Sequence, residues 1–310
     1  MTLLVKSGGE DVFPEWKGYF AEFAPDVDTR FWNDPDVSPE SVEYVMVWEP
    51  PVGWLAKFPN LQVVFSSGAG VDHITRDPDW PRHLPLVRMG GMEQRMSEYV
   101  VWAALTALRD TRDFALGQAA HEWRYKEVPH SARDLTVGIM GMGNLGIAAA
   151  AALRGMGFKT RGWSRTPKTL DGIESFAGAG DLGDFLAGTD ILVDLLPATP
   201  ATENMIDAHL LAGLPDHATF INAGRGKHLV EADLLAALDA GTLGGAVLDV
   251  FQTEPLPADS PIWDHPKVTV TPHIASTPTK REKARYVAEG IQLFNEGKDL
   301  PNVFSPENGY

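Results

Sequence analysis

The chain has 310 residues, a formal net charge of −16 and no cysteine. The missing cysteines exclude disulfides and thiolate metal sites, and the acidic balance argues against nucleic acid or an anionic membrane as a partner. No apolar run reaches the length of a membrane span, and the start, MTLLVKSGGED, becomes polar too early for a secretory signal, so we expect a cytoplasmic protein.

The first hundred residues alternate loosely between strand-like and helical segments, with strands predicted over 2–7, 44–48 and 61–67. In 91–110 the apolar positions recur at steps of three and four, which predicts one long helix. We place a domain boundary near its start. Another helix is predicted over 280–297 at the end of the chain. We therefore expect a substrate domain of residues 1–98 plus 282–310 and a nucleotide-binding domain of residues 99–281.

From Leu135 onward, short β-rich runs alternate with helical ones. Strands are predicted over 135–141, 158–164, 190–197, 218–224, 244–251 and 267–273, and helices over 144–157, 182–188, 207–214 and 231–241. Because parallel neighbours need crossover helices, this alternation predicts a parallel, doubly wound sheet.

The sequence GMGNLG, which is Gly141, Met142, Gly143, Asn144, Leu145 and Gly146, matches the dinucleotide fingerprint G-x-G-x-x-G. It follows a predicted strand and opens a predicted helix, and that context gives the match its meaning. The first glycine allows a tight turn, the second lets the backbone approach a pyrophosphate, and the third permits close helix–strand packing. The alternative is a glycine turn that only packs a helix on a sheet.

The second predicted strand of this region ends at Ser164, which is 164 − 146 = 18 residues after the last glycine. An NAD-binding unit usually places an acidic residue there to bind the ribose 2′-hydroxyl. Ser164 is instead followed by Arg165, Thr166 and Lys168, which suit a 2′-phosphate. An aspartate would repel that phosphate by about 4 kcal/mol at an effective dielectric near 20. We expect NADP(H) to be preferred, with NAD(H) possible; the alternative is an ordinary solvated turn.

Three polar residues stand near strand ends: Arg225 in NAGRGKHLV, Glu254 in LDVFQTEPLP and His273 in VTVTPHIAS. Ligands of open α/β sheets bind beyond the carboxyl ends of the strands, so the three could converge. An arginine can hold a carboxylate and polarise a neighbouring carbonyl, and a histidine can protonate the carbonyl oxygen as hydride arrives. A carboxylate beside the histidine favours its protonated form. These residue types suit the reduction of a 2-keto acid.

These segments resemble the D-isomer-specific 2-hydroxyacid dehydrogenase family, whose catalytic triad is Arg–Glu–His. The spacings fit, at 254 − 225 = 29 and 273 − 254 = 19 residues, and SSGAGVDH (66–73) and LPATPATENMID (196–207) resemble further family segments. VWEPP, GWSRTPK and DSPIW are similar to the glyoxylate/hydroxypyruvate reductase A-like branch. The resemblance implies an α/β fold of two doubly wound, Rossmann-like lobes, with a dinucleotide-binding domain inserted in a flavodoxin-like substrate domain.

The resemblance also implies an activity: NADPH-preferring reduction of small 2-keto acids, such as glyoxylate or hydroxypyruvate, to D-2-hydroxy acids. In the reaction that the resemblance implies, Arg225 binds and polarises the substrate and His273 is the acid/base. Glu254 orients the histidine and favours its protonated form. The implied substrate-binding residues are Trp48, Gly68, Ala69, Gly70, Val71, Met92 and Arg225. Further implied cofactor contacts are Leu196, Pro197, Ala223, Gly224, Asp249, His273 and Ala275, with Asp249 near the nicotinamide amide.

The resemblance implies a homodimer built around the long helix and the 111–130 arm, and we assign His121 and Trp123 to packing or to this contact. We expect no metal, because HEWRY (121–125) has Tyr125 where H-E-x-x-H needs its second histidine. No role is assigned to His130, His209, His217, His228 and His265.

Two other functions are considered. A nucleotide-sensing, corepressor-like binding protein of the same fold needs the glycine loop but no efficient triad. Another Rossmann enzyme, such as an amino-acid dehydrogenase, needs a catalytic lysine or a different acid/base set. The complete triad favours the reductase over both.

Overall fold

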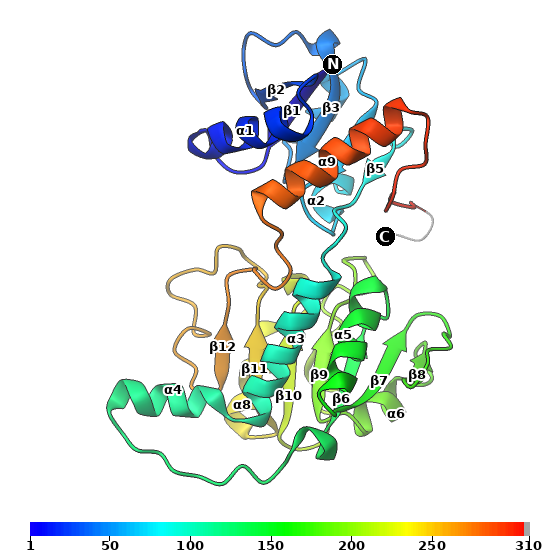
Figure 1. Cartoon of the computed structure of the whole chain (residues 1–310). Helices are drawn as coiled ribbons and strands as arrows, with labels where there is room; N and C mark the ends of the chain where they lie inside the picture. Colours follow the sequence, from blue (N-terminus) through cyan, green and yellow to red (C-terminus); the bar gives the residue numbers. More distant parts are fainter. Residues whose placement is uncertain (307–310) are drawn as a thin grey trace. The chain divides into compact units, whose positions relative to one another are not determined.

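A computed structural model describes residues 1–306 of the chain, which divides into two compact units (Figure 1). Unit 1 comprises Met1–Met92 and Thr277–Tyr310, and unit 2 comprises Glu93–Ser276. The last four residues of the expected segment 282–310 lie outside the described residues.

The unit boundaries fall just outside two helices, whereas the expected boundaries at 98/99 and 281/282 fall inside them. α3 (Glu93–Leu108) belongs wholly to unit 2, and α9 (Lys280–Asn295) belongs wholly to unit 1. The reason is that each helix packs as one element from its first turn. Met96, for example, is already buried in the core of unit 2.

In unit 1 the strands are β1 (Thr2–Lys6), β2 (Asp28–Phe31), β3 (Val42–Val47), β4 (Val63–Ser66) and β5 (Leu86–Val87), and the further α-helices are α1 (Phe13–Phe23) and α2 (Asp72–Thr75). Unit 2 contains β6 (Thr136–Met140), β7 (Lys159–Ser164), β8 (Glu174–Ala177), β9 (Ile191–Asp194), β10 (Ala218–Asn222), β11 (Leu243–Leu248) and β12 (Val268–Val270). Its further α-helices are α4 (Thr111–Ala120), α5 (Asn144–Gly155), α6 (Leu182–Ala187), α7 (Ala208–Leu211) and α8 (Glu231–Ala240).

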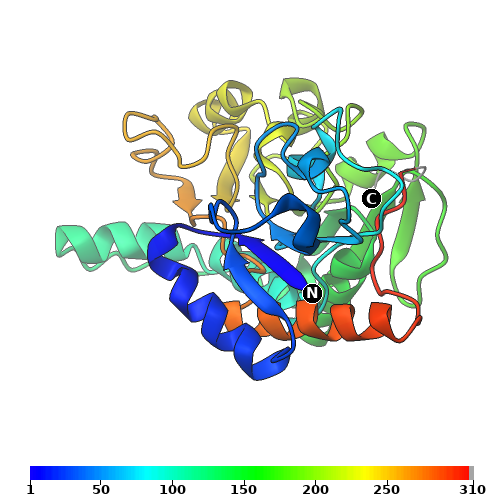
Figure 2. The same cartoon turned by 90° about the horizontal axis from the view of Figure 1, so that it is seen from above.

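The sheet of unit 1 has the strand order β2-β1-β3-β4-β5, and its described pairs are parallel. This is the flavodoxin-like order. α1 and α9 lie side by side (Figure 1 and Figure 2), joined by an ion pair between Lys280 and Glu15. The sequence did not predict β2 or β5. β2 shows no clean alternation of buried and exposed side chains, and β5 is only two residues long.

The sheet of unit 2 has the order β12-β11-β10-β9-β6-β7-β8, also with parallel pairs. Side chains alternate between its faces: Val193 packs with α3 and α5, whereas Leu192 packs with the helices of the other face (Figure 1). The strand order reverses between β6 and β9, which is where a Rossmann sheet binds its ligand. The expected fold class of two doubly wound lobes is confirmed.

The expected long helix ends at Leu108, and α4 starts three residues later after a turn in which Asp110 has φ 49°. A non-glycine residue in this left-handed conformation ends a helix, because the next N–H can no longer point back along its axis. Among residues 1–306, no helix combines the length and the apolar character needed to cross a membrane.

Candidate functional site

The glycine loop joins β6 to α5, as the sequence predicted. Gly141 has φ +102°, and an added Cβ would lie 2.5 Å from the Leu195 carbonyl oxygen. A Cβ on Gly146 would lie 2.1 Å from the carbonyl oxygen of Gly141, so the first turn of α5 packs against the loop only with glycine there. Gly143 is the N-cap of α5 and has open space where its Cβ would be. The loop is therefore tightly packed at Gly141 and Gly146, and it leaves free space at Gly143, where a pyrophosphate would approach the helix N-terminus.

Basic side chains stand beside this loop at the end of β7. Lys168 Nζ donates a hydrogen bond to the Met142 carbonyl oxygen at 2.5 Å, which places its ammonium at the glycine loop. Ser164 is buried and its Oγ donates to the Thr166 carbonyl oxygen at 2.8 Å, while Arg165 is exposed. Ser164 thus shapes the turn, Arg165 is exposed beside it, and the half-buried Lys168 reaches the glycine loop. This arrangement suits an anionic group on the ribose.

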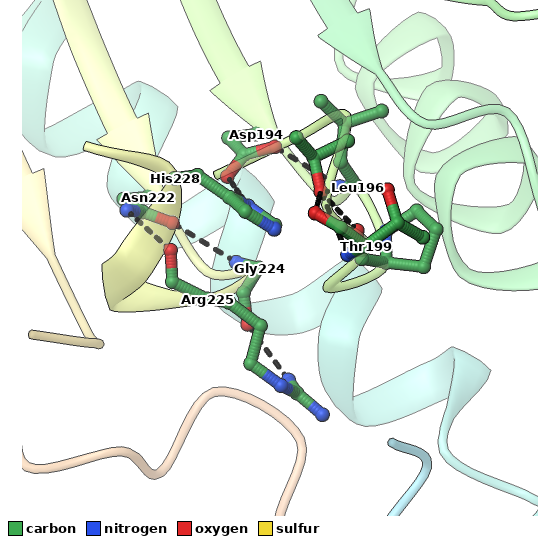
Figure 3. Close-up of polar contacts among 9 residues, drawn as sticks. Asp194, Leu196, Thr199, Asn222, Gly224, Arg225 and His228 are labelled. Carbon is green, nitrogen blue, oxygen red and sulfur yellow. Dashed lines mark hydrogen bonds and ion pairs between the residues drawn. The ribbon is translucent and has the colours of Figure 1, made fainter. Parts of the chain in front are cut away.

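Arg225 follows β10 in a loop fixed by buried groups (Figure 3). Asn222 is fully buried; its Oδ1 accepts from the Gly224 N–H at 3.1 Å and its Nδ2 donates to the Arg225 carbonyl oxygen at 3.2 Å. The Arg225 guanidinium donates to the Gly224 carbonyl oxygen at 2.8 Å. At Gly226 a Cβ would lie 1.9 Å from the Phe251 carbonyl oxygen, so the chain can pass there only with glycine.

His273 stands after β12 with φ 54°, a conformation that is unfavourable for a non-glycine residue. Asp249 holds this segment in place. Its Oδ1 accepts from the Ile274 N–H at 2.9 Å and from the Thr271 hydroxyl at 2.6 Å, and its Oδ2 accepts from the Ala275 N–H at 2.8 Å. The expected contact of Asp249 with a nicotinamide amide stays a prediction, because this carboxylate is only 1% exposed in the chain by itself.

His273 and Glu254 form a hydrogen bond of 2.7 Å between Nδ1 and Oε2, and Glu254 Oε1 accepts from the Phe251 N–H at 3.0 Å. Burial by itself raises the pKa of Glu254. The hydrogen bonds from His273 and Phe251 and the nearby charges of His273 and Arg225 together outweigh it and lower the pKa below its usual range. Because an ionised carboxylate only accepts, Nδ1 is the donor, and Nε2 is the ring nitrogen not used in this bond.

The expected substrate-binding residues of unit 1 follow neighbouring strands of its sheet. Trp48 comes after β3, residues 68–71 after β4 and Met92 after β5. Ser66 Oγ donates to the Gly70 carbonyl oxygen at 2.9 Å and accepts from the Gly68 N–H at 3.2 Å, which fixes the loop. A Cβ on Gly68 would lie 2.9 Å from the Trp48 ring, so the loop packs directly against that indole. Unit 1 thus brings Trp48 and the 68–71 loop together.

A buried pair that was not predicted from the sequence lies beside the Arg225 loop. His228, to which no role was assigned from the sequence, has Nδ1 2.7 Å from Oδ2 of Asp194, and both side chains are almost wholly buried (Figure 3). A charged residue that ends the otherwise apolar strand ILVD was the available signal. The expected cofactor contacts Leu196 and Pro197 lie in the loop directly after Asp194, and Ala223 and Gly224 lie in the loop after β10.

The model of the D-isomer specific 2-hydroxyacid dehydrogenase NAD-binding domain matches residues 101–275. The chain is 42% identical over 305 residues, 96% of each chain, to a glyoxylate/hydroxypyruvate reductase A of Klebsiella pneumoniae (strain 342). It is 40% identical over 303 residues, again 96% of each, to one from Serratia proteamaculans (strain 568).

Two solved structures are similar over nearly the whole chain. A D-isomer specific 2-hydroxyacid dehydrogenase from Xanthobacter autotrophicus Py2, in complex with NADPH and MES, is 41% identical with a TM-score of 0.90 and 99% of each chain covered. An NADPH-dependent glyoxylate/hydroxypyruvate reductase from Sinorhizobium meliloti, in complex with NADP and sulfate, is 41% identical with a TM-score of 0.91, covering 100% of this chain and 99% of the other.

The contacts of Glu254 predict a pH-dependent contribution to stability. Its pKa is lower in the folded protein than in the unfolded chain, so the ionised carboxylate stabilises the fold above the unfolded pKa, and this contribution is lost as pH falls through the folded pKa. Glu254→Gln should therefore lower Tm at neutral pH, with the difference from wild type shrinking toward acid. Thermal unfolding of both proteins, from neutral pH down through the folded pKa of Glu254, measures this difference in Tm. Glu203→Gln, which changes an exposed glutamate, is the control. A difference in Tm that grows toward acid contradicts the stabilising role of the ionised Glu254.

Proposed function

The chain belongs to the D-isomer specific 2-hydroxyacid dehydrogenase family, and on that basis we propose that it reduces small 2-keto acids, such as glyoxylate and hydroxypyruvate, to D-2-hydroxy acids with NADPH. The observation that carries the proposal is the 2.7 Å hydrogen bond between His273 and Glu254 in the unit that holds the glycine loop. An acid/base pair of this kind favours catalysis over a purely nucleotide-sensing role.

Proton delivery is the step assigned to His273. A nicotinamide bound beyond the strand ends would supply the hydride for the carbonyl carbon of the keto acid. The protonated imidazole gives the proton on Nε2 to the carbonyl oxygen, so that the product gains one hydride and one proton. Glu254 holds the ring through Nδ1 and, because it stays ionised, stabilises the imidazolium before transfer.

Substrate binding is the role assigned to Arg225. Its guanidinium can bind a carboxylate through two parallel N–H donors, and its charge polarises the adjacent carbonyl. The bonds from Asn222 fix the backbone that carries it. In unit 1 we assign substrate binding to the backbone N–H groups of Ala69, Gly70 and Val71, together with Trp48 and Met92, as the resemblance implies.

NADP(H) is the proposed cofactor. The support from this chain is the absence of an acid at Ser164 and the presence of Arg165 and Lys168 around the same turn. Similar proteins from Xanthobacter and Sinorhizobium were solved with NADPH and NADP. NAD(H) would use the same glycine loop without these cations, and we expect it to bind more weakly.

We also propose a cytoplasmic homodimer, in which the segment from α3 through residue 130 forms the contact. α4 projects away from the sheet of unit 2 (Figure 1 and Figure 2). Trp123 and Tyr125, which follow it, are 94% and 80% exposed in the single chain, and Trp102 and Phe114 are partly exposed. Aromatic side chains are enriched at protein–protein contacts, which supports this segment as the contact.

The reductase proposal predicts NADPH oxidation by the purified chain with glyoxylate or hydroxypyruvate. His273→Gln should lower kcat/KM by at least about a hundredfold, because the proton donor is lost. His209→Gln, which changes an exposed histidine of the same unit, serves as the control. A folded His273→Gln variant with wild-type kcat/KM would contradict the assignment.

The cofactor proposal predicts that the double substitution Ser164→Asp, Arg165→Ala lowers the ratio of kcat/KM for NADPH to that for NADH by at least about tenfold. The new carboxylate repels a 2′-phosphate and can accept a bond from a 2′-hydroxyl. Lys159→Ala, which removes a cation at the other end of β7, is the matched control. An unchanged ratio in the double variant would refute the role of this turn.

The dimer proposal predicts a solution mass of about twice 33.8 kDa by light scattering. Trp123→Ser combined with Tyr125→Ser should shift the mass toward that of one chain, since both exposed rings would lie in the contact. A wild-type mass of one chain would contradict the assembly.

A further inference from the structure

Asp194 and His228 form a polar pair inside unit 2. Asp194 is 0% exposed and His228 is 1% exposed, and Oδ2 and Nδ1 are 2.7 Å apart. Among residues 1–306 no group of three or more histidine, aspartate or glutamate side chains is placed to hold a metal ion. The pair therefore needs another explanation.

Asp194 connects two loops. Its Oδ1 accepts from the Leu196 N–H at 3.0 Å, in the loop that follows β9, while its Oδ2 contacts His228 beyond the Arg225 loop (Figure 3). A Cβ on Gly224 would lie 2.8 Å from Oδ2, so the backbone just before Arg225 packs directly on the carboxylate. One carboxyl group thus lies against both the loop after β9 and the loop that leads into Arg225.

His228 is itself fixed by its backbone. Its N–H donates to the Arg225 carbonyl oxygen at 3.1 Å, and its carbonyl oxygen accepts from the Ile206 N–H at 2.8 Å. Together with the bond from Asn222 Nδ2, the Arg225 carbonyl oxygen accepts two hydrogen bonds. A shift of the His228 ring would therefore be transmitted to the residue that carries the guanidinium.

Stability alone does not account for the pair. Burying charged or strongly polar groups is costly, and a well-packed apolar pair of similar volume is often as stable or more stable. Here the polar pair lies under two loops to which the sequence assigns ligand contacts. An apolar pair could not provide two features of this arrangement. One is the directional hydrogen bond between His228 Nδ1 and Asp194, and the other is the Asp194 oxygen that accepts from the Leu196 N–H.

We propose that Asp194 and His228 are positioning residues, which hold the Leu196 loop and the Arg225 loop in register so that cofactor and keto acid bind together. The inference rests on the proposed reductase function. The pair acts through Leu196 and Arg225, and neither Asp194 nor His228 contacts the reacting atoms. The role depends on one donor, Nδ1, because His228 Nε2 has no hydrogen-bond partner among the described residues.

The test compares two amide substitutions at His228. Asparagine places its amide nitrogen near the position of Nδ1 and keeps the donor to Asp194, whereas glutamine places its amide nitrogen near Nε2 and loses it. Relative to wild type, His228→Gln should raise KM for glyoxylate about tenfold and the Kd of NADPH, measured by fluorescence titration, by at least about threefold. His228→Asn should stay within about threefold of wild type in both quantities.

A merely structural role gives a different result. Loss of folded protein lowers apparent kcat and Tm but leaves KM and the NADPH Kd unchanged, and that result in both variants would overturn the proposal. Equal KM and Kd values for the asparagine and glutamine variants would also overturn it, because the donor position would then not matter. His209→Gln and His209→Asn are the matched controls on an exposed histidine of the same unit.

The NADPH titration separates this inference from the proposed function. If the wild type binds NADPH but reduces no 2-keto acid, the reductase proposal fails, and the Kd values of the two His228 variants still decide the positioning role. If turnover is present and the glutamine variant keeps wild-type KM and Kd, only the positioning role fails.

Discussion

Three polar side chains are buried at the ends of neighbouring strands in unit 2: Asp194 is the last residue of β9, Asn222 is the last residue of β10, and Asp249 directly follows β11. Each accepts hydrogen bonds from N–H groups of a loop at the carboxyl edge of the sheet. Leaving such a buried group unpaired costs about 1–3 kcal/mol, so the bonds define the loop conformations. Buried side chains at the strand ends therefore hold the loops that carry Leu196, Arg225 and His273.

The distribution of charge at the candidate site explains how an acidic chain can bind an anionic cofactor and substrate. The net charge of −16 describes the whole molecule, but a ligand responds to the groups within a few ångströms of it. At the candidate site these are the open glycine loop at the N-terminus of α5, Lys168 beside it, and Arg225 beyond β10. The carboxylates of the site are hydrogen-bonded within the protein: Asp249 accepts from the loop after β12, and Glu254 binds His273.

The parts of the structure that could be predicted from sequence are those with a local signal. The fingerprint over 141–146 stands between a strand and a helix, as its pattern predicts. Arg225, Glu254 and His273 were selected by their residue types and by a spacing that resembles the family's, and their catalytic roles stay predictions. β8, with the sequence ESFA, has little apolar character, and the left-handed turn at Asp110 depends on its own backbone geometry. The Asp194–His228 bond joins residues 34 positions apart, and only the fold brings them together.

We propose that the chain moves a hydride from NADPH to C2 of a 2-keto acid while His273 supplies the proton. The most direct test is a reaction of the wild-type protein with hydroxypyruvate and NADPH that carries deuterium at both C4 positions, with the product analysed by mass spectrometry and chiral chromatography. Hydride transfer from C4 of the cofactor should give D-glycerate with one deuterium at C2. A product that lacks deuterium at C2, or that has the L configuration, would contradict it.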